Sequence, residues 1–480
     1  MRTMLGLKSA PHMGKPVAVQ PGLSQRATET PLVSPLPIPS APPLPAEIVR
    51  SSLRASIKDA AAWSVMQGVG TNYLTPFVSL GGRGLIYLAA FAALPALASG
   101  IVQWFSANLT DVFGRRNRII IGAALLQAFI WLPICISILL PQPGGYLLML
   151  ACYVIFVGLA NFANPAWQSV MGDLVPADRR GRYFGIRNAI SGVVLVGSFF
   201  AAGGWLGWCE GAPVMTRLGL SGRDFGFLVL FALAGLARLL SAYYLSQVHE
   251  PEYRRTPADR FTFLEFIRRA PRAHFGRFVF YCTLINAAFG LTGPFFAWYL
   301  LDQLRFGPTR FAVVVTASLL CNVATQPLWG RLVDRIGSKR VIAMGGVAIA
   351  FWPLLILACR DFWHFVAVMC YDGISTAAYS IAVGNYFYDV VTPPKRARCV
   401  AYYTLFIGVG SAVGSFGGAA LGLLTPLPLH LPGLTLDHPY SVLLAASTIV
   451  RLLTNALLLG TFEEFRLRRP VFAPASPPGG

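Results

Sequence analysis

The sequence predicts an all-α membrane protein in which twelve transmembrane helices form two pseudo-symmetric bundles of six helices each. The composition is the first reason: 55% of the 480 residues are hydrophobic and only 12% are charged, whereas about 25% of the residues of a soluble domain are charged. The second reason is a series of apolar segments close to the roughly 20 residues that a helix needs to cross a bilayer. The third is a set of charged motifs that recurs between these segments. Such an internal repeat is typical of duplicated membrane proteins, which are most often transporters.

One short charged motif occurs twice, each time between two long apolar runs. In the first copy Asp111 is followed by Gly114, Arg115 and Arg116, and the second copy begins at Asp334. In both copies a glycine and then basic residues follow the acid. This many charges are too costly inside lipid, so the motif marks a tight turn at the membrane surface. The copies lie nearly half the chain length apart.

Two further landmarks support the duplication. Asp173 and Asp389 each precede a basic cluster, and Arg238 and Arg451 each lie near the end of a half. Because the three landmarks recur in the same order, we interpret the chain as an internal repeat.

The basic residues are unevenly distributed along the chain, whose net charge is +19. They gather in alternate connecting segments, at 115–118, 179–182, 254–272, 331–340, 395–398 and 466–469. This is the positive-inside bias, which places these segments and both termini in the cytoplasm. It also explains the basic composition without a nucleic-acid partner.

The eight cysteines are scattered and form no close pair with metal-binding or redox spacing. No His-Glu-x-x-His helix or other cluster of catalytic residues is present in the sequence. We therefore expect no cofactor and no metal, and we expect that the protein is not an enzyme.

The first half begins with a proline-rich segment, residues 1–57, which we expect to be a disordered cytoplasmic tail. The N-terminal six-helix bundle is expected over residues 58–246. Its six predicted spans are Ala60–Leu80, Leu85–Leu109, Ile119–Leu140, Leu147–Val170, Phe184–Leu206 and Phe225–Leu245.

A basic cytoplasmic linker, residues 247–277, is expected to join the halves through a short amphipathic helix on the inner leaflet. The C-terminal six-helix bundle follows over residues 278–464, with a cytoplasmic tail at 465–480. Its six predicted spans are Phe278–Leu301, Phe311–Leu332, Val341–Cys359, Phe365–Phe387, Val400–Leu423 and Tyr440–Phe462.

Glycines recur at every fourth position of the eleventh predicted span, at Gly410, Gly414, Gly418 and Gly422. Glycines at this spacing form a smooth stripe, which predicts close packing against another helix.

These features resemble the major facilitator superfamily of secondary transporters over about Lys58 to Glu464. The hallmark of that family is a Gly-x-x-x-Asp-Arg-x-Gly-Arg-Arg loop after the second span, with a degenerate copy after the eighth. The residues that match it are Asp111, Gly114, Arg115, Arg116, Gly330, Asp334, Arg335, Gly337 and Lys339. Markers of individual subfamilies are mostly missing, so no substrate subfamily is assigned.

The resemblance implies that these motif residues gate the cytoplasmic side. Asp111 would then meet the start of the eleventh span near Arg398, and Asp334 would meet the start of the fifth span near Arg182, each at a positive helix N-terminus. The alternative is a solvated loop whose charges only set the topology.

The same resemblance implies that the first, fourth, seventh and tenth spans line a central cavity. Polar residues on those spans are therefore candidates to line it: Gln67, Thr71, Asn72, Asn161, Asn164, Gln168, Asn286, Asp372, Thr376 and Tyr379. Amides facing lipid would be costly, which favours a wet interior. Hydrogen bonding between helices, without ligand contact, is the alternative for each of them.

Asp372 is the most conspicuous acid within a predicted span and is our candidate for proton or ion coupling. A carboxyl near the bilayer midplane must be protonated, paired or bound to a cation. The alternative is a structural hydrogen bond. For Arg238 and Arg451 we expect a structural role rather than substrate binding.

The predicted function is a secondary active transporter that moves a small solute by alternating access, with a coupling proton or ion as an open possibility. The alternative is a non-transporting membrane sensor or assembly factor on the same fold. We expect a monomer embedded in the lipid bilayer of a cell membrane, specifically a bacterial inner membrane, with small-molecule substrate as its main partner.

Overall fold

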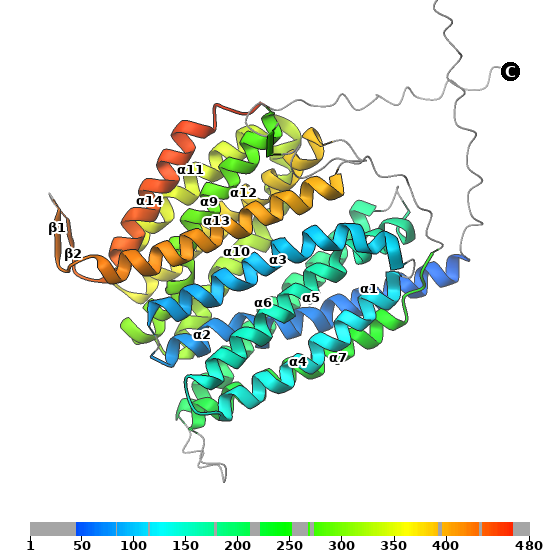
Figure 1. Cartoon of the computed structure of the whole chain (residues 1–480), viewed down its shortest axis with the longest axis horizontal. Coiled ribbons are helices and arrows are strands. Elements are labelled where there is room, and N and C mark those ends of the chain that lie inside the picture. The colour runs from blue at the N-terminus through cyan, green and yellow to red at the C-terminus, as the bar shows by residue number, and fades with distance from the viewer. Residues whose placement is uncertain are drawn as a thin grey trace, which may run out of the picture. The chain divides into compact units, whose positions relative to one another are not determined.

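A computed structural model describes residues 45–82, 84–113, 116–176, 180–211, 221–251, 267–268, 273–391, 396–431 and 434–463. The helices of the first half run in chain order as a bundle (Figure 1). They are α1 (Ala46–Met66), the π-helical segment η1 (Gln67–Thr71), α2 (Asn72–Leu80), α3 (Leu85–Phe113), α4 (Arg116–Leu139), α5 (Gly144–Leu174), α6 (Arg180–Gly211) and α7 (Gly222–Ser246).

The second half repeats this arrangement, including a π-helical segment at the end of its first long helix. Its elements are α9 (His274–Trp298), η2 (Tyr299–Gln303), α10 (Pro308–Ile336), α11 (Ser338–Leu357), α12 (Phe362–Val390), α13 (Arg396–Leu424), β1 (Leu429–Leu431), β2 (Leu434–Leu436) and α14 (Pro439–Leu458). The two short strands pair antiparallel, with Leu429 opposite Leu436. Every predicted span corresponds to one of these helices, so the predicted all-α fold is confirmed.

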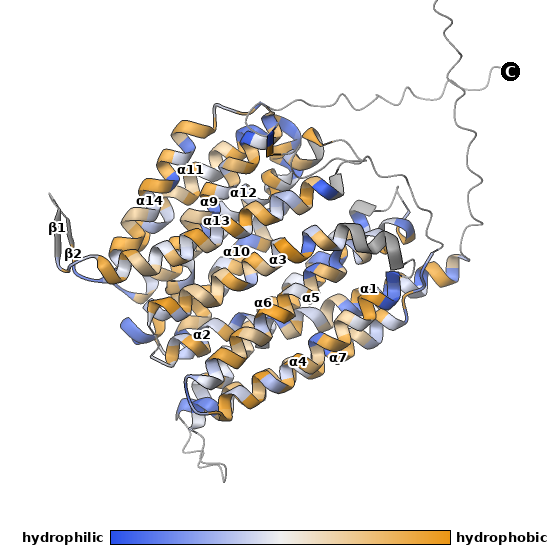
Figure 2. Ribbon diagram, viewed as in Figure 1, coloured by the Kyte–Doolittle hydropathy of each residue, from blue (hydrophilic) through white to orange (hydrophobic). Residues whose placement is uncertain are grey.

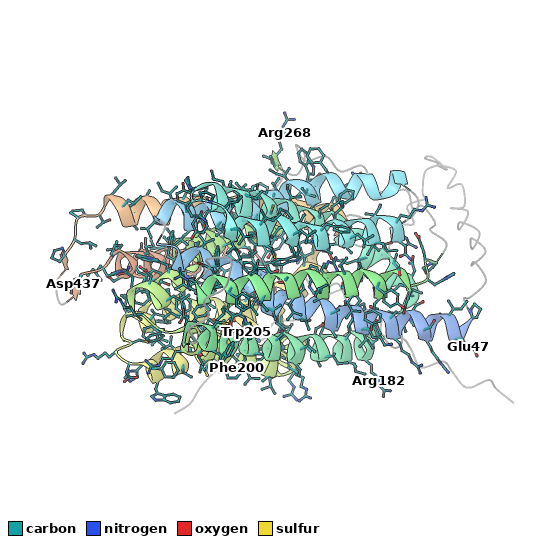
Figure 3. All side chains as sticks on the ribbon, turned by 90° about the horizontal axis from the view of Figure 1, so that it is seen from below. Glu47, Arg182, Phe200, Trp205, Arg268 and Asp437 are labelled. Atoms are coloured by element: carbon teal, nitrogen blue, oxygen red, sulfur yellow. The ribbon has the colours of Figure 1, made fainter. Side chains whose placement is uncertain are left out.

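Eleven helices in the described part of the chain are long and apolar enough to cross a membrane. The first predicted span is the exception, because α1 carries several charged residues and is followed by η1 and α2. Figure 2 shows apolar residues along the lengths of the helices and hydrophilic residues near many of their ends. Glu47 and Asp437 lie at opposite ends of the bundle, and Phe200 lies on its flank, 48% exposed (Figure 3).

The boundary expected at residue 57 falls inside a helix. Helix α1 begins at Ala46, directly after Pro45, and already buries Ser52 and Ser56. The folded part of the first half therefore begins earlier than expected, because a helix that emerges from the bilayer can continue into water with charged residues on it. The rest of the expected tail lies outside the described residues, as does most of the expected linker helix.

The two halves meet mainly through two pairs of helices. Helices α3 and α13 lie side by side, where a β-carbon at Gly408 would overlap the carbonyl oxygen of Ala96. Helices α6 and α10 form the second pair, where a β-carbon at Gly203 would overlap the side chain of Ala312. Small residues therefore bring the backbones of the two halves together.

The glycine stripe of α13 packs against α9 as predicted. β-Carbons at Gly410, Gly414 and Gly418 would come too close to the carbonyl oxygens of Thr283, Ala287 and Leu291, respectively. These three oxygens follow one another at four-residue steps along α9, so the stripe lies along one row of its backbone. The predicted close packing is confirmed for these three positions.

We predict that Gly414→Ala lowers the stability of the protein by about 1–3 kcal/mol, the usual cost of overpacking a rigid contact. The added methyl would meet backbone atoms of Ala287, which cannot rotate away. Thermal unfolding of detergent-purified protein measures the effect. Gly417→Ala is the matched control, because the nearest atom to its β-carbon would be Leu291 Cδ2 at 3.9 Å. Equal melting temperatures for the two variants would contradict the prediction.

Candidate functional site

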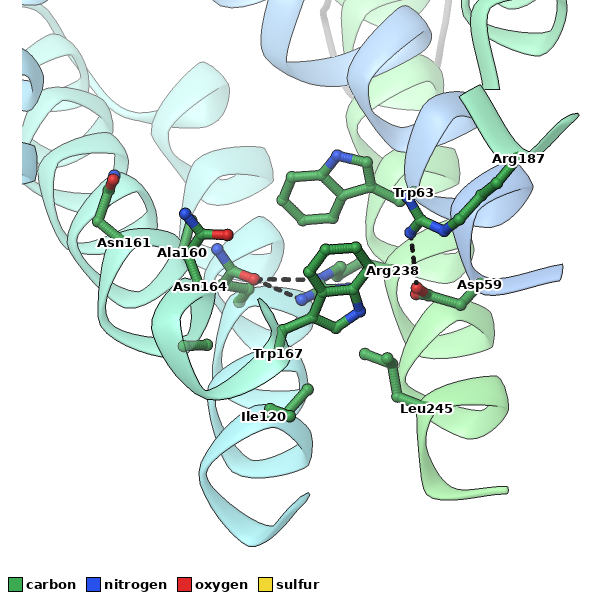
Figure 4. A pocket seen from close by; sticks show the side chains of 12 residues that line it. Asp59, Trp63, Ile120, Ala160, Asn161, Asn164, Trp167, Arg187, Arg238 and Leu245 are labelled. Carbon is green, nitrogen blue, oxygen red and sulfur yellow. Dashed lines mark hydrogen bonds and ion pairs between the residues drawn. The ribbon is translucent and has the colours of Figure 1, made fainter. Parts of the chain in front are cut away.

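A cavity of about 360 Å³ lies within the first half and holds three charged side chains. We call it the arginine cavity and define it by Asp59, Trp63, Gln127, Trp167, Arg187 and Arg238 (Figure 4). These residues come from α1, α4, α5, α6 and α7, so five helices contribute to its wall. Its volume is at the lower end of the range for small-molecule sites.

The charged groups of the arginine cavity form one hydrogen-bonded network. Asp59 accepts a hydrogen bond of 2.7 Å from Ser241 Oγ, and its other carboxylate oxygen lies 3.5 Å from Arg187 Nη2. Arg238 donates to Gln127 Oε1 from both Nε (3.0 Å) and Nη2 (2.7 Å), and Nη1 donates to Ser241 Oγ. Ser241 therefore connects the carboxylate to the second guanidinium.

The network is almost closed to solvent. Asp59 is 4% exposed and Arg238 is 6% exposed, while the side chain of Arg187 is 14% exposed. Charges buried to this extent require partners, since breaking such a set leaves an uncompensated ion. Arg238 meets this need with three hydrogen bonds, two to Gln127 and one to Ser241.

Two tryptophans cover the guanidinium groups. Arg187 lies 4.6 Å from the ring centre of Trp167, and Arg238 lies 4.5 Å from the ring centre of Trp63. Cation–π contacts of this kind stabilise a partly desolvated cation. The cavity therefore combines charge with flat apolar walls.

Helix α5 extends from the arginine cavity to a second cavity. Asn161 and Asn164 line the arginine cavity. One turn before Asn161, Val157 lines the second cavity, and its carbonyl oxygen accepts a hydrogen bond from Asn161 Nδ2. A single helix face thus joins the two spaces.

The second cavity, of about 470 Å³, lies between the two halves, and we call it the central cavity. The first half contributes Tyr153 and Val157, and the second half contributes Asn286, Phe289 and Ser411. Asn286 donates to the carbonyl oxygen of Cys282, so its amide oxygen remains available as an acceptor. Aromatic rings with a few hydroxyls and amides suit an amphiphilic organic solute.

A second buried arginine lies behind the wall of the central cavity. Arg451 is 0% exposed, donates to the carbonyl oxygen of Ile349 at 2.7 Å, and lies 4.2 Å from the ring centre of Phe289. Among the described residues, none accepts a hydrogen bond from Arg451 Nε. Phe289 therefore contacts this cation and also lines the central cavity.

The polar residues expected to line a cavity are divided among several places. Asn161 and Asn164 line the arginine cavity, and Asn286 lines the central cavity. Gln168 is exposed one turn beyond Asn164, whose Oδ1 accepts its hydrogen bond at 3.3 Å. The fourth and seventh spans thus bring three of the expected residues to the two cavities.

Three expected residues of the first span lie in or beside the π-helical segment. Gln67 and Thr71 are the first and last residues of η1, and Asn72 is exposed. Thr71 contacts Met66 Sδ at 3.4 Å. None of the three is among the residues that line the two cavities described above.

The tenth span turns its expected residues toward its neighbours. Asp372 accepts a hydrogen bond of 2.7 Å from Ser318 Oγ on α10, and Thr376 accepts one from Asn322 Nδ2. Tyr379 is buried and donates to Cys282 Sγ at 3.6 Å, within the apolar core of the second half. The structure thus places Tyr379 in the core, because its ring fills space between α9 and α12.

In the first motif copy, Arg116 joins three helices of its own half. Its Nη1 lies 2.6 Å from Asp173 Oδ2 and donates to Ser169 Oγ, while its backbone N–H donates to Glu250 at 2.7 Å. Its side chain is 1% exposed. Two landmarks of the sequence repeat, Asp173 and the motif arginine, therefore meet in space.

The remaining residues of the first copy cannot be placed at a contact. Gly114 and Arg115 lie outside the described residues, and so does the side chain of Asp111, which belongs to the last turn of α3. Their expected gating contacts therefore stay predictions.

The second motif copy forms the turn between α10 and α11. Gly337 has φ +97°, a left-handed conformation that favours glycine, and it ends α10. Gly330 has open space around its α-carbon, and Lys339 Nζ lies 5.8 Å from the ring centre of Phe462. Asp334 and Arg335 are exposed, and neither has an ion pair within the described part of the chain. The expected contact of Asp334 with the start of α6 stays a prediction.

Five residues of the arginine cavity are not among those predicted from the sequence: Asp59, Gln127, Arg187, Trp63 and Trp167. Asp59 falls one residue before the expected start of the first span. Arg187 is the residue from which the site could have been predicted, because a cation inside the fifth predicted span needs a partner within the protein.

Comparison with known proteins gives one consistent result. The family model described as Major Facilitator Superfamily matches residues 278–429. The chain is 24% identical over 367 residues to Multidrug resistance protein 2 of Bacillus subtilis, covering 74% of this chain and 82% of that protein. It is 27% identical over 131 residues to the sphingosine-1-phosphate transporter SPNS2 of Danio rerio, but these cover only 25% of that relative.

Solved structures share the fold. A mutant form of the nucleoside transporter NupG aligns with a TM-score of 0.65 at 12% identity, covering 86% of this chain and 100% of that one. The xylose transporter XylE from E. coli aligns with a TM-score of 0.61 at 13% identity, covering 87% and 99%. At these identities the likeness concerns the fold and not the substrate.

We predict that Arg116→Gln lowers the stability of the first half by about 1–3 kcal/mol, because two carboxylates lose their buried partner. The side chain of Asp173 is 47% exposed, which keeps the cost below that of a fully buried pair. Thermal unfolding in detergent measures it, with Arg118→Gln, two residues away and exposed, as the matched control. A variant at Arg116 that melts like the parent but no longer functions would instead favour a gating role.

Proposed function

We propose that this chain, a secondary transporter of the major facilitator superfamily, carries its solute along α5 through the central cavity and the arginine cavity and couples the movement to protons. The fold and the matches described above support the family and alternating access. The observation that carries the route is the continuous face of α5, on which Tyr153 and Val157 line one cavity and Asn161 and Trp167 line the other.

The contacts between the halves support alternating access. The α6–α10 contact includes Gly203 with Ala312 and Gly192 with Val323, whereas Asp334 at the far end of α10 is exposed. Contacts made by small residues have little interdigitation, so one half can rotate against the other without breaking a hydrogen-bonded interface. The basic end of the α6–α10 pair is then the gate that opens in this state.

Two carboxyl groups, that of the buried Asp59 and that of the half-buried Asp372, can change charge during such a cycle. Asp372 is held by Ser318 on one side, and Asp59 is held by Ser241 and Arg187. A proton that binds either group removes a negative charge from a medium of low dielectric constant. This change shifts the equilibrium between the two open states of the cycle. We retain Asp372 as the first coupling candidate and add Asp59 as the second.

The route is tested by reconstitution of the purified full-length chain in proteoliposomes with an imposed pH gradient. A panel of fluorescent organic solutes, neutral, anionic and cationic, provides the substrates. We expect at least one solute to accumulate against its gradient, and we expect this accumulation to stop when the proton gradient is collapsed. Downhill movement alone would support a uniporter, and no movement of any solute would contradict the transport route proposed here.

We predict that Asp372→Asn abolishes uphill accumulation while downhill exchange continues. The amide keeps the shape of the carboxyl group and can still hydrogen-bond with Ser318, but it cannot carry a proton on and off. Asp437→Asn, in the exposed loop before α14, is the matched control. If the Asp372 variant accumulates solute as well as the parent with unchanged pH dependence, Asp372 has only a structural role.

We place the protein as a monomer in a bacterial inner membrane with both termini in the cytoplasm, on the basis of the basic connecting segments. A single cysteine at Gln20 in a cysteine-free background tests the orientation. A membrane-impermeant thiol reagent should label this site only after the cells are permeabilised. Labelling in intact cells would reverse the topology.

A further inference from the structure

We propose that the arginine cavity binds a solute with one negative charge and a flat apolar body. This inference rests on the transport route proposed above and names the class of solute that enters it. The charges of the lining favour an anion. Among the described residues that line the cavity, Asp59 is the one acid and Arg187 and Arg238 are the two cations, so these residues carry one positive charge in excess.

The two arginines differ in how far they are satisfied. Arg238 donates two hydrogen bonds to Gln127 and one to Ser241, which makes it a fixed part of the wall. Within the described part of the chain, the polar contacts of Arg187 are both long: 3.4 Å from its Nε to the carbonyl oxygen of Ser56 and 3.5 Å from its Nη2 to Asp59. It is also the more exposed of the two. Arg187 is therefore the cation that can turn toward a solute.

The carboxylate of Asp59 does not offer an equivalent site for a cation. It is 4% exposed, and its two oxygens already face Ser241 and Arg187. A cationic solute would have to approach two guanidinium groups to reach it, which is unfavourable in a medium of low dielectric constant. An anion meets the excess charge directly and can bind a guanidinium through two oxygens.

The remaining walls define the rest of the solute. Figure 4 shows Arg187 and Asp59 pointing toward each other, with the rings of Trp63 and Trp167 beside the buried guanidinium of Arg238. Indole rings stack well on flat aromatic groups. Asn161 bonds to its own helix through Nδ2, which leaves its amide oxygen to orient a polar edge of the solute. A small aromatic carboxylate satisfies all three features within about 360 Å³.

The test is isothermal titration of the detergent-purified full chain with three probes of the same shape: 2-naphthoate, its neutral amide 2-naphthamide, and the cation 2-naphthylmethylammonium. We expect 2-naphthoate to bind at least about tenfold more tightly than either of the others. Equal binding of the three probes, preference for the ammonium, or no binding of 2-naphthoate would overturn the proposal.

Two variants of the cavity should act in opposite directions. Arg187→Gln should lower the affinity for 2-naphthoate by about tenfold or more and the affinity for 2-naphthamide by about twofold at most. Arg187→Lys should retain part of the preference for the anion. Asp59→Asn should raise the affinity for 2-naphthoate, because it removes the carboxylate that competes for Arg187 and keeps an oxygen that accepts from Ser241. Arg360→Gln, an exposed arginine between α11 and α12, controls for the net charge of the protein. An Arg187→Gln variant that loses both uncharged and anionic probes equally would point to collapse of the cavity and would count against a specific anion site.

Flux of the same three probes in proteoliposomes separates this inference from the proposed function. Binding of 2-naphthoate without flux would retain the anion site and contradict the transport route. Flux of the ammonium probe without binding of 2-naphthoate would retain transport and overturn the anion site.

Discussion

A charge placed inside a bilayer must find its partners within the protein, and this constraint determines how the first half is assembled. Arg238 on α7 is 6% exposed. It donates hydrogen bonds to Gln127 and to Ser241, and Ser241 in turn donates to the carboxylate of Asp59, which balances the charge. These partners lie on α1 and α4, so the network holds three helices at fixed positions and leaves a cavity where α5 and α6 approach. The arginine cavity therefore lies where the buried charged side chains are paired with one another, and these side chains form part of its wall.

The second half solves the same problem with other groups, although the sequence repeats. Arg451 occupies the place on α14 that Arg238 occupies on α7, but it donates to the backbone of α11 and is covered by the rings of Phe289 and Trp352. Its acid, Asp372, lies on α12 and makes no ion pair with it in the described structure. The two halves therefore share the cation at the corresponding place but differ in its partners.

The fold was accessible from the sequence because its determinants are local. The length of each apolar run specifies a span, the basic clusters orient it, and the glycine at Gly414 signals a close contact before its partner is known. The site was less accessible, because it depends on which helices become neighbours. Asp59 and Arg187 come from helices far apart in the sequence, and only the fold shows that they are neighbours. Tyr379 shows the opposite error, since a polar ring on a cavity helix can equally fill the core.

The π-helical segments explain why the polar residues of the first span do not lie on one face. A π turn contains one residue more than an α turn, and one residue corresponds to about 100° of rotation about the helix axis. Beyond η1, α2 therefore presents a different side from the one that α1 would present by continuing regularly. Thr75 on α2 lines the central cavity, whereas Ser64 on α1 is buried. The segment η2 occupies the corresponding place after α9, so the first long helix of each half carries the same rotation. In each half, the residues before and after the π-helical segment therefore face the solute path from two different helical registers.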